Sequence, residues 1–184
     1  PQAGSEGQLL QLVQHIDRSR YEPHMTLLRG GDNTSWKAFP CPVGVLDIAK
    51  LASHRNIVRI LRFAFRLRRE GFRIVHCYFN DSSMIAPPFL KLCGIRVLVS
   101  RRDMGFWYTP AKLVFLRIVA PFVDCYVANS QAVRGLVQRQ EWVPSKKLQV
   151  IYNGYAVGGE GAGDEQADAS RLDFPEHDPV VGIV

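Results

Sequence analysis

Short apolar runs alternate with longer stretches of helical periodicity over most of this chain. Four runs are strand-like, and they fall at 72–75, 95–99, 123–128 and 148–152. The stretches between them carry apolar residues at helical spacing, near 82–93, 110–120 and 130–142. Alternation of strands with helices is typical of a parallel sheet with crossover helices. The pattern therefore predicts an α/β fold, with a Rossmann-like parallel sheet and helices on both of its faces.

The N-terminal part of the chain continues this alternation less regularly. Residues 6–18 have the apolar spacing of a helix, and 23–28 and 43–48 resemble short strands. A longer helix is expected from Ser53, a residue suited to capping, to Glu70. Because the first helix has no strand before it, we expect the first strand of this domain to be missing.

The composition changes after Asn153. Glycines and most of the acidic residues gather between 154 and 178, which indicates a linker, and 179–184 resemble a buried strand. We therefore expect a first domain at 1–153, an acidic glycine-rich linker at 154–178 and the start of a second domain at 179–184. This organisation predicts a fragment of a longer protein, trimmed at both ends.

Charge is distributed unevenly over the 184 residues. The chain has a net charge of +6, yet residues 160–178 hold seven acidic residues and one arginine. That segment is therefore at −6, which leaves +12 for the rest of the chain. A body this basic favours anionic partners, such as nucleic acid, an acidic membrane face or phosphorylated substrates.

Polar clusters follow the four strand-like runs. They are His76, Ser100-Arg101-Arg102-Asp103, Asn129-Ser130 and Asn153-Gly154. Parallel strands bring their carboxyl ends to one edge of the sheet, and ligands of open α/β sheets bind at that edge. The clusters therefore predict a ligand site on a common rim.

The clusters after the first two runs have the clearest chemistry. At a cleft, His76 could donate a hydrogen bond or carry a proton, and the alternative is a structural histidine bonded to a loop. Of Arg101 and Arg102, one is expected to pair with Asp103 and the other to face a phosphate or sugar. The aromatic residues at 106–108 offer a flat apolar surface for a sugar ring, or alternatively a plug into the core.

The remaining candidates have ordinary structural explanations beside the functional ones. Gly4 and Ser5 precede a helix whose N-terminus could attract phosphate, or they form a common turn. Asn129-Ser130 is expected to cap the following helix. Asn153-Gly154 is either a turn or a hinge.

Five arginines of the helix beginning near Ser53 form one stripe. They are Arg55, Arg59, Arg62, Arg66 and Arg69, at steps of four, three, four and three. The opposite, core-facing side is expected to hold Ile57, Ile60, Leu61, Ala64 and Leu67. Like charges at this spacing repel one another, so an anionic surface such as acidic lipid would favour the stripe. The alternative is a solvated face with counter-ions.

The four cysteines have no Cys-x-x-Cys spacing and no histidine pair in zinc-finger register. We expect no metal site and no disulfide framework. Free thiols fit a reducing, cytoplasmic compartment.

In several of these segments, the chain resembles the N-terminal domain of a family 4 (group 1) glycosyltransferase of GT-B architecture. The segments that carry the resemblance are 3–10, the strand end at His76, 127–130, 150–154 and 179–184. The resemblance implies two Rossmann-like domains facing one cleft, with the acceptor received mainly by this one. It implies a retaining, metal-independent sugar transfer from a UDP- or GDP-linked donor, with no cofactor.

The resemblance also implies roles for individual residues. Gly4 and Ser5 would approach the donor diphosphate, with Arg101, Asn129, Ser130, Asn153 and Gly154 as further donor-binding candidates. His76, Arg102 and Asp103 would serve catalysis, with the segment 101–103 on the acceptor side. The acceptor would be a glycan or a lipid-linked molecule of polysaccharide biosynthesis, at the cytoplasmic face of the plasma membrane. The family's donor motif belongs to the second domain, so this fragment is expected to be inactive alone.

Two other functions compete with this one. A non-catalytic basic α/β module could bind anionic lipid or nucleic acid, but no nucleic-acid motif is present and no nucleic-acid partner is expected. A nicotinamide-dependent Rossmann enzyme would need Gly-x-Gly-x-x-Gly after a first strand, and the sequence has none.

Overall fold

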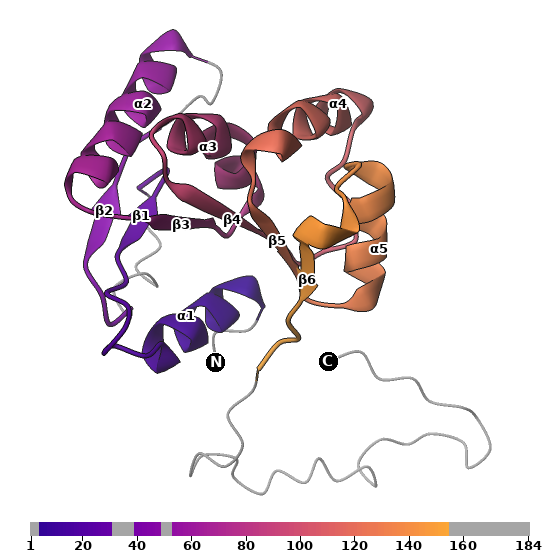
Figure 1. Ribbon diagram of the computed structural model, residues 1–184, viewed down its shortest axis with the longest axis horizontal. Coiled ribbons are helices and arrows are strands. Elements are labelled where there is room, and N and C mark those ends of the chain that lie inside the picture. The colour runs from indigo at the N-terminus through magenta and orange to yellow at the C-terminus, as the bar shows by residue number, and fades with distance from the viewer. Residues whose placement is uncertain (1–3, 31–38, 49–52, 155–184) are drawn as a thin grey trace, which may run out of the picture. The chain divides into compact units, whose positions relative to one another are not determined.

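The structure is a computed structural model that describes residues 4–30, 39–48 and 53–154. Strands and helices alternate along it (Figure 1). The strands are β1 (Met25–Leu27), β2 (Val43–Val45), β3 (Ile74–Cys77), β4 (Arg96–Arg101), β5 (Cys125–Ala128) and β6 (Leu148–Val150). The α-helices are α1 (Ser5–His15), α2 (His54–Arg69), α3 (Asn80–Leu92), α4 (Pro110–Val119) and α5 (Gln131–Gln140). Two short 3₁₀ helices, η2 (Ala120–Phe122) and η3 (Ser145–Lys147), complete the order.

All described strands pair in parallel, in two sheets. One sheet pairs β1 with β2, and the other has the order β3-β4-β5-β6. In the larger sheet His76 lies opposite Leu98, and Arg101 lies opposite Ala128. The predicted parallel α/β sheet is therefore confirmed, and the carboxyl ends of β3 to β6 meet at one edge.

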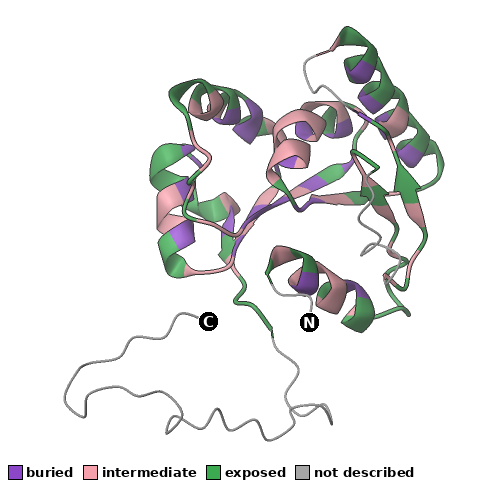
Figure 2. Ribbon diagram, turned by 180° about the vertical axis from the view of Figure 1, so that it is seen from behind, coloured by how far each residue is buried: buried purple, intermediate pink, exposed green. Residues whose placement is uncertain are grey.

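Helices flank the strands on both sides. In Figure 1, α1 lies below the strands, whereas α2, α3 and α4 lie above them. Side chains from β3 to β6 and from α2, α3 and α5 build one core, and buried segments of these elements are visible in Figure 2. Its largest fully buried aliphatic and aromatic members include Leu90, Ile95, Val97, Val99, Val123, Tyr126, Val137 and Val143. Burial of such side chains is the main favourable contribution to this fold.

Of the four strand-like runs, two end two residues later than predicted, and the last ends two residues earlier, at Val150. His76 is part of β3, and Ser100 and Arg101 are part of β4, so these residues do not follow their strands as expected. The backbone of β4 stays paired with β5 up to Arg101, because Arg101 is opposite Ala128 in the register. Arg102 is thus the first residue beyond the strand.

The N-termini of the helices agree only partly with the expected caps. Ser130 accepts a hydrogen bond from the backbone N–H of Val133 at 3.2 Å, which confirms its capping of α5. Ser53 is at the N-cap of α2, but its hydroxyl makes no capping bond. The helix α3 begins after Phe79 without a side-chain cap, and the Ser82 hydroxyl donates to the Phe79 carbonyl.

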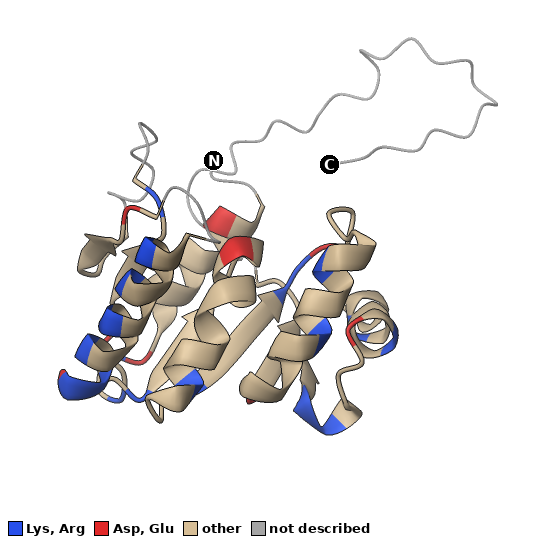
Figure 3. Ribbon diagram, turned by 90° about the horizontal axis from the view of Figure 1, so that it is seen from above, with Lys and Arg blue, Asp and Glu red and all other residues tan. Residues whose placement is uncertain are grey.

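Helix α2 buries a narrower face than its sequence predicts. Ile60, Ala64 and Leu67 are buried as expected, but Ile57 and Leu61 are 39% and 40% exposed. The predicted core-facing side was therefore too wide by these two residues. The arginines of α2 lie on its outer surface, as Figure 3 shows for the blue segments on this helix.

Two further predictions concern other parts of the chain. The prediction that the first strand of the domain is missing concerns the chain before α1, where residues 1–3 lie outside the described residues. Most of the linker at 154–178 and the strand at 179–184 lie outside them as well. Among the described helices none has the length and apolar character needed to cross a membrane. The four cysteines are free thiols.

Candidate functional site

The carboxyl edge of the larger sheet brings together His76, Ser100, Arg102 and Asn153, which we call the rim cluster. The Nε2 of His76 lies 2.8 Å from the Ser100 hydroxyl on the neighbouring strand. Beyond β4, the guanidinium of Arg102 donates a hydrogen bond to the amide oxygen of Asn153. Residues from β3, β4 and the segment after β6 therefore converge, as the parallel topology predicts.

The environment of His76 keeps its imidazole neutral. Burial, and to a smaller extent the nearby positive charge of Arg102, lower the pKa of His76 to about 4. At neutral pH the ring therefore has one N–H donor and one acceptor nitrogen. Such a ring can hydrogen-bond a ligand without adding positive charge to the site.

An aromatic side chain completes the rim cluster on the side of β3. The Tyr78 ring packs edge-on against His76, with ring centroids 5.3 Å apart. The guanidinium carbon of Arg102 lies 5.0 Å from the centroid of the same ring. Tyr78 thus holds two of the predicted residues in place by ring and cation–π contacts.

The first turn of α1 reaches the same rim. Gly4 has a φ of +83°, and it leads into α1 without a side-chain cap. The side-chain amide of Gln8 donates a hydrogen bond to the Gly154 carbonyl at 2.9 Å. This bond places the uncapped N-terminus of α1 beside the segment Asn153-Gly154, where free backbone N–H groups favour an anion.

Arg101 has partners other than the predicted ones. Its side chain is only 4% exposed, and its Nε and Nη2 donate to the two carboxylate oxygens of Glu141 at 2.7 and 2.9 Å. A third donor bond, of 2.8 Å, reaches the Ser83 hydroxyl. The expectation that one arginine pairs with Asp103 is therefore wrong, because Arg101 forms an ion pair with Glu141 and Arg102 donates a hydrogen bond to Asn153. A guanidinium this occupied and buried has a structural role in this structure.

Asp103 organises the loop after β4. One carboxylate oxygen accepts from the backbone N–H of Gly105 at 2.7 Å and from the Trp107 indole N–H at 3.1 Å. The Tyr108 hydroxyl donates to Glu141, so the loop is also tied to the buried ion pair. Phe106, in contrast, is 89% exposed. Of the three aromatic residues proposed as a sugar platform, Phe106 alone has its ring largely in solvent.

Asn129 contributes a polar atom that lacks a partner among the described residues. Its amide nitrogen donates to the Arg102 carbonyl at 3.0 Å, whereas its side-chain oxygen is buried and makes no hydrogen bond there. A buried acceptor without a partner is costly, and a water or a ligand donor commonly satisfies it. Asn129 is therefore the rim residue best suited to accept from a bound molecule.

Some residues of the site were not among the candidates from the sequence. Tyr78 and Gln8 hold the rim cluster and α1, while Glu141 anchors Arg101. Tyr78 lies two residues after His76, and this strand spacing was the only local signal for any of the three. Within 4–30, 39–48 and 53–154, no group of three or more His, Cys, Asp or Glu side chains is placed to hold a metal ion.

Comparisons with known proteins agree with the fold described above. The family model described as Glycosyltransferase Family 4 matches residues 3–157. The crystal structure of Anabaena Alr3699/HepE in complex with UDP and glucose has a TM-score of 0.65 at 17% sequence identity, and its complex with UDP has 0.62 at 17%. Each comparison covers 83% of this chain and 41% of HepE, so this chain spans about two fifths of that protein. At this identity the likeness shows the fold. No match was found among curated proteins.

Proposed function

Since this chain belongs to glycosyltransferase family 4 and has the fold of one half of a GT-B enzyme, we propose that it forms the acceptor-side half of a retaining glycosyltransferase. The reaction would move a sugar from a nucleotide-sugar donor to a lipid-linked or polysaccharide acceptor. The observation that carries this proposal is the convergence of the rim cluster and the N-terminus of α1 on one edge of the sheet.

The donor would be a UDP- or GDP-linked sugar. The HepE complexes contain UDP, one of them with glucose, which favours UDP as the first donor to test. On this chain, the free N–H groups of α1 after Gly4 and the guanidinium of Arg102 supply the positive potential that a diphosphate needs. Arg102 is only partly buried, so it can turn from Asn153 toward a ligand.

The charges of the site suit an early break of the sugar–phosphate bond. Negative charge grows on the departing diphosphate, and a helix N-terminus with an arginine can stabilise it without a metal ion. Positive charge grows on the sugar at the same time. A neutral His76 can hydrogen-bond a sugar hydroxyl without repelling that charge, since its pKa is about 4.

The acceptor would lie along the loop after β4. Asp103 fixes this loop, and Phe106 offers an exposed apolar ring against which a sugar or the first part of a lipid can pack. Asp103 would therefore influence acceptor binding indirectly, because it fixes the conformation of the loop. The arrangement needs no cofactor other than the nucleotide sugar itself.

The domain organisation predicted from the sequence is part of the same proposal. Residues 1–153 would form the acceptor-side domain, 154–178 the linker and 179–184 the start of the donor-binding half. Because a GT-B site is built from two halves and this chain spans two fifths of HepE, we expect residues 1–184 alone to be inactive. The whole enzyme would work in the cytoplasm, on the inner face of the plasma membrane.

The experiment is a donor screen on the complete enzyme that contains this chain. Release of UDP or GDP is measured with a panel of nucleotide sugars, with and without lipid-linked acceptors. Release that depends on one donor, without added metal and in the presence of a chelator, is expected. Failure of every donor, together with binding of lipid or nucleic acid, would favour a non-catalytic basic module instead.

A further inference from the structure

Helix α2 is strongly basic, and it contains no acidic residue that could balance the charge of its arginines. Its 16 residues contain six arginines and no acidic residue, and the first acid is Glu70 after the helix ends. The ion pair between Arg66 and Glu70 is long, at 3.8 Å, and more than half of each side chain is exposed. An ion pair this exposed to solvent contributes little to stability, so it does not explain why the helix contains so many arginines.

Large apolar side chains are exposed on the same helix. Val58 is 43% exposed, Leu61 is 40% exposed and Phe65 is 63% exposed. Their spacing of three and four residues puts them on one side of α2, beside the face that buries Ile60 and Ala64. The outer surface of α2 therefore presents arginines and an apolar strip together.

We propose that this surface docks on an anionic lipid bilayer, with the arginines at the headgroups and Phe65 among the first acyl-chain carbons. Basic helices with an apolar side lie in the membrane interface in this way. Each arginine near an anionic leaflet adds to the electrostatic attraction between the helix and the membrane. Each apolar side chain that enters the interface removes apolar surface from water. Nucleic acid would use the arginines but would leave Val58, Leu61 and Phe65 in water.

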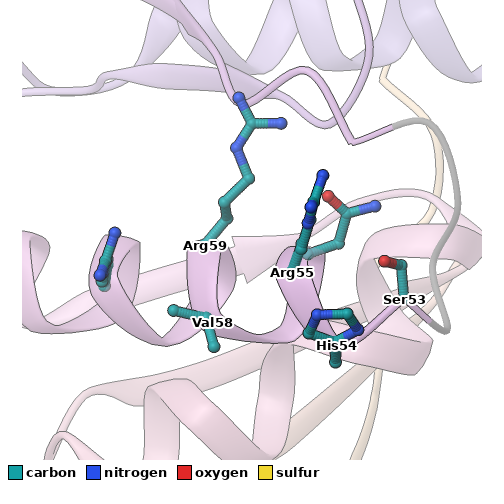
Figure 4. A pocket seen from close by; sticks show the side chains of 7 residues that line it. Ser53, His54, Arg55, Val58 and Arg59 are labelled. Atoms are coloured by element: carbon teal, nitrogen blue, oxygen red, sulfur yellow. The ribbon is translucent and has the colours of Figure 1, made fainter.

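The start of α2 offers space for a lipid headgroup. A depression of about 420 Å³ is lined by Arg55, Arg59 and Arg62 together with Ser53 and His54. In Figure 4, Arg55 and Arg59 extend from one side of the helix and Val58 points away from them. Arg59 also donates to the Asp47 carbonyl at 2.8 Å, so this guanidinium is held in place at the edge of the depression.

Arg62 and Arg69 are the arginines to change first. Both are exposed, and within the described residues neither makes a hydrogen bond or an ion pair, so their replacement leaves the fold intact. The matched control is Arg139→Glu with Lys146→Glu, which alters the net charge equally at exposed positions on α5 and η3. Binding of the 184-residue chain is measured by flotation with phosphatidylcholine vesicles, with and without phosphatidylglycerol.

The wild-type chain is expected to float with the phosphatidylglycerol vesicles and to stay in solution with phosphatidylcholine alone. Arg62→Glu with Arg69→Glu should weaken this binding on the order of thirtyfold, whereas the control pair should change it less than threefold. Equal binding of the two double variants overturns the proposal. So does a wild-type chain that binds no vesicles.

The apolar strip has its own test. Phe65→Ser should weaken binding to phosphatidylglycerol vesicles about tenfold, because the ring no longer enters the interface. Leu12→Ser is the control, since Leu12 is 45% exposed on α1, on the other side of the strands (Figure 1). If Phe65→Ser binds vesicles as the wild type does, the surface binds through charge alone and the proposal is overturned. If single-stranded DNA displaces the vesicles, the surface is a nucleic-acid site, and the proposal is overturned as well. These measurements use no sugar donor, so their failure would leave the proposed transfer reaction untouched.

Discussion

Burial of His76 makes the stability of this domain depend on pH. The unfolded chain binds a proton at this imidazole below pH 6.5, but the folded chain does so only below about pH 4. Between these values the unfolded state holds more protons, so folding becomes less favourable as the pH falls. The loss attributable to His76 across the window is on the order of 3 kcal/mol at most.

His76→Gln should remove this part of the pH dependence. Glutamine keeps a polar group near Ser100 but does not titrate, so the slope of unfolding free energy against pH between 6.5 and 4 should flatten. Urea unfolding at several pH values gives the slope. A titration of the His76 ring proton by NMR with a midpoint near 6.5 would show that the ring is not held neutral in the folded protein.

The buried pair of Arg101 and Glu141 should be important for stability. Glu141 is fully buried and accepts from two of the three guanidinium nitrogens of Arg101, so Glu141→Gln leaves a buried charge without its partner. We expect a loss of about 3–5 kcal/mol in the free energy of unfolding by urea. Glu70→Gln, the same change at the exposed pair with Arg66, should cost less than about 1 kcal/mol. Similar losses for the two variants would contradict the structural role of Glu141.

These side-chain partners mark the limit of what the sequence could predict. His76, Arg102 and Asn153 were identifiable because each lies at or just beyond the end of an apolar run. The partner of Arg101 is 40 positions away on a different element, and no local pattern distinguishes Glu141 from other acids. Burial of Arg101 was missed for the same reason, since a strand of apolar residues ending in arginine usually places that arginine in solvent.

Among the elements, the loop after β4 depends on one glycine. Gly105 has a φ of +71°, and a Cβ there would lie 2.6 Å from Cδ2 of Tyr108. Gly105→Ala should therefore lower stability by about 2 kcal/mol and move Phe106 away from its position. The comparison is Gly154→Ala, where a Cβ meets nothing within 4 Å and the change should stay within about 0.5 kcal/mol. Equal unfolding midpoints in urea would mean that the loop adapts freely.

Helices and strands were predictable to within about three residues, because apolar periodicity is a local property of the chain. Their exact ends were not, since they depend on pairing with a neighbour: β4 extends to Arg101 only because β5 supplies a partner there. The exposed side chains of Ile57 and Leu61 have a similar origin. Periodicity predicts the direction of the buried face of α2, but the packing of neighbouring elements determines its width.

For the molecule as a whole, the prediction that said most about the position of the site was the parallel order of the strands. It follows from alternating strands and helices, and it implies that residues far apart in the sequence share one edge of a sheet. The hydrogen bonds between His76 and Ser100, between Arg102 and Asn153 and between Gln8 and Gly154 agree with that implication. Membership of glycosyltransferase family 4 gives this edge its chemical context.

The most direct test of the rim cluster is the kcat/KM for sugar transfer by the complete enzyme carrying Arg102→Ala, with Arg139→Ala on α5 as the control. If Arg102 contacts the donor diphosphate as proposed, loss of its guanidinium should lower kcat/KM roughly a hundredfold or more, and the control should match the wild type. A kcat/KM for Arg102→Ala within about twofold of the wild type, in a protein of unchanged stability, would show that transfer occurs elsewhere.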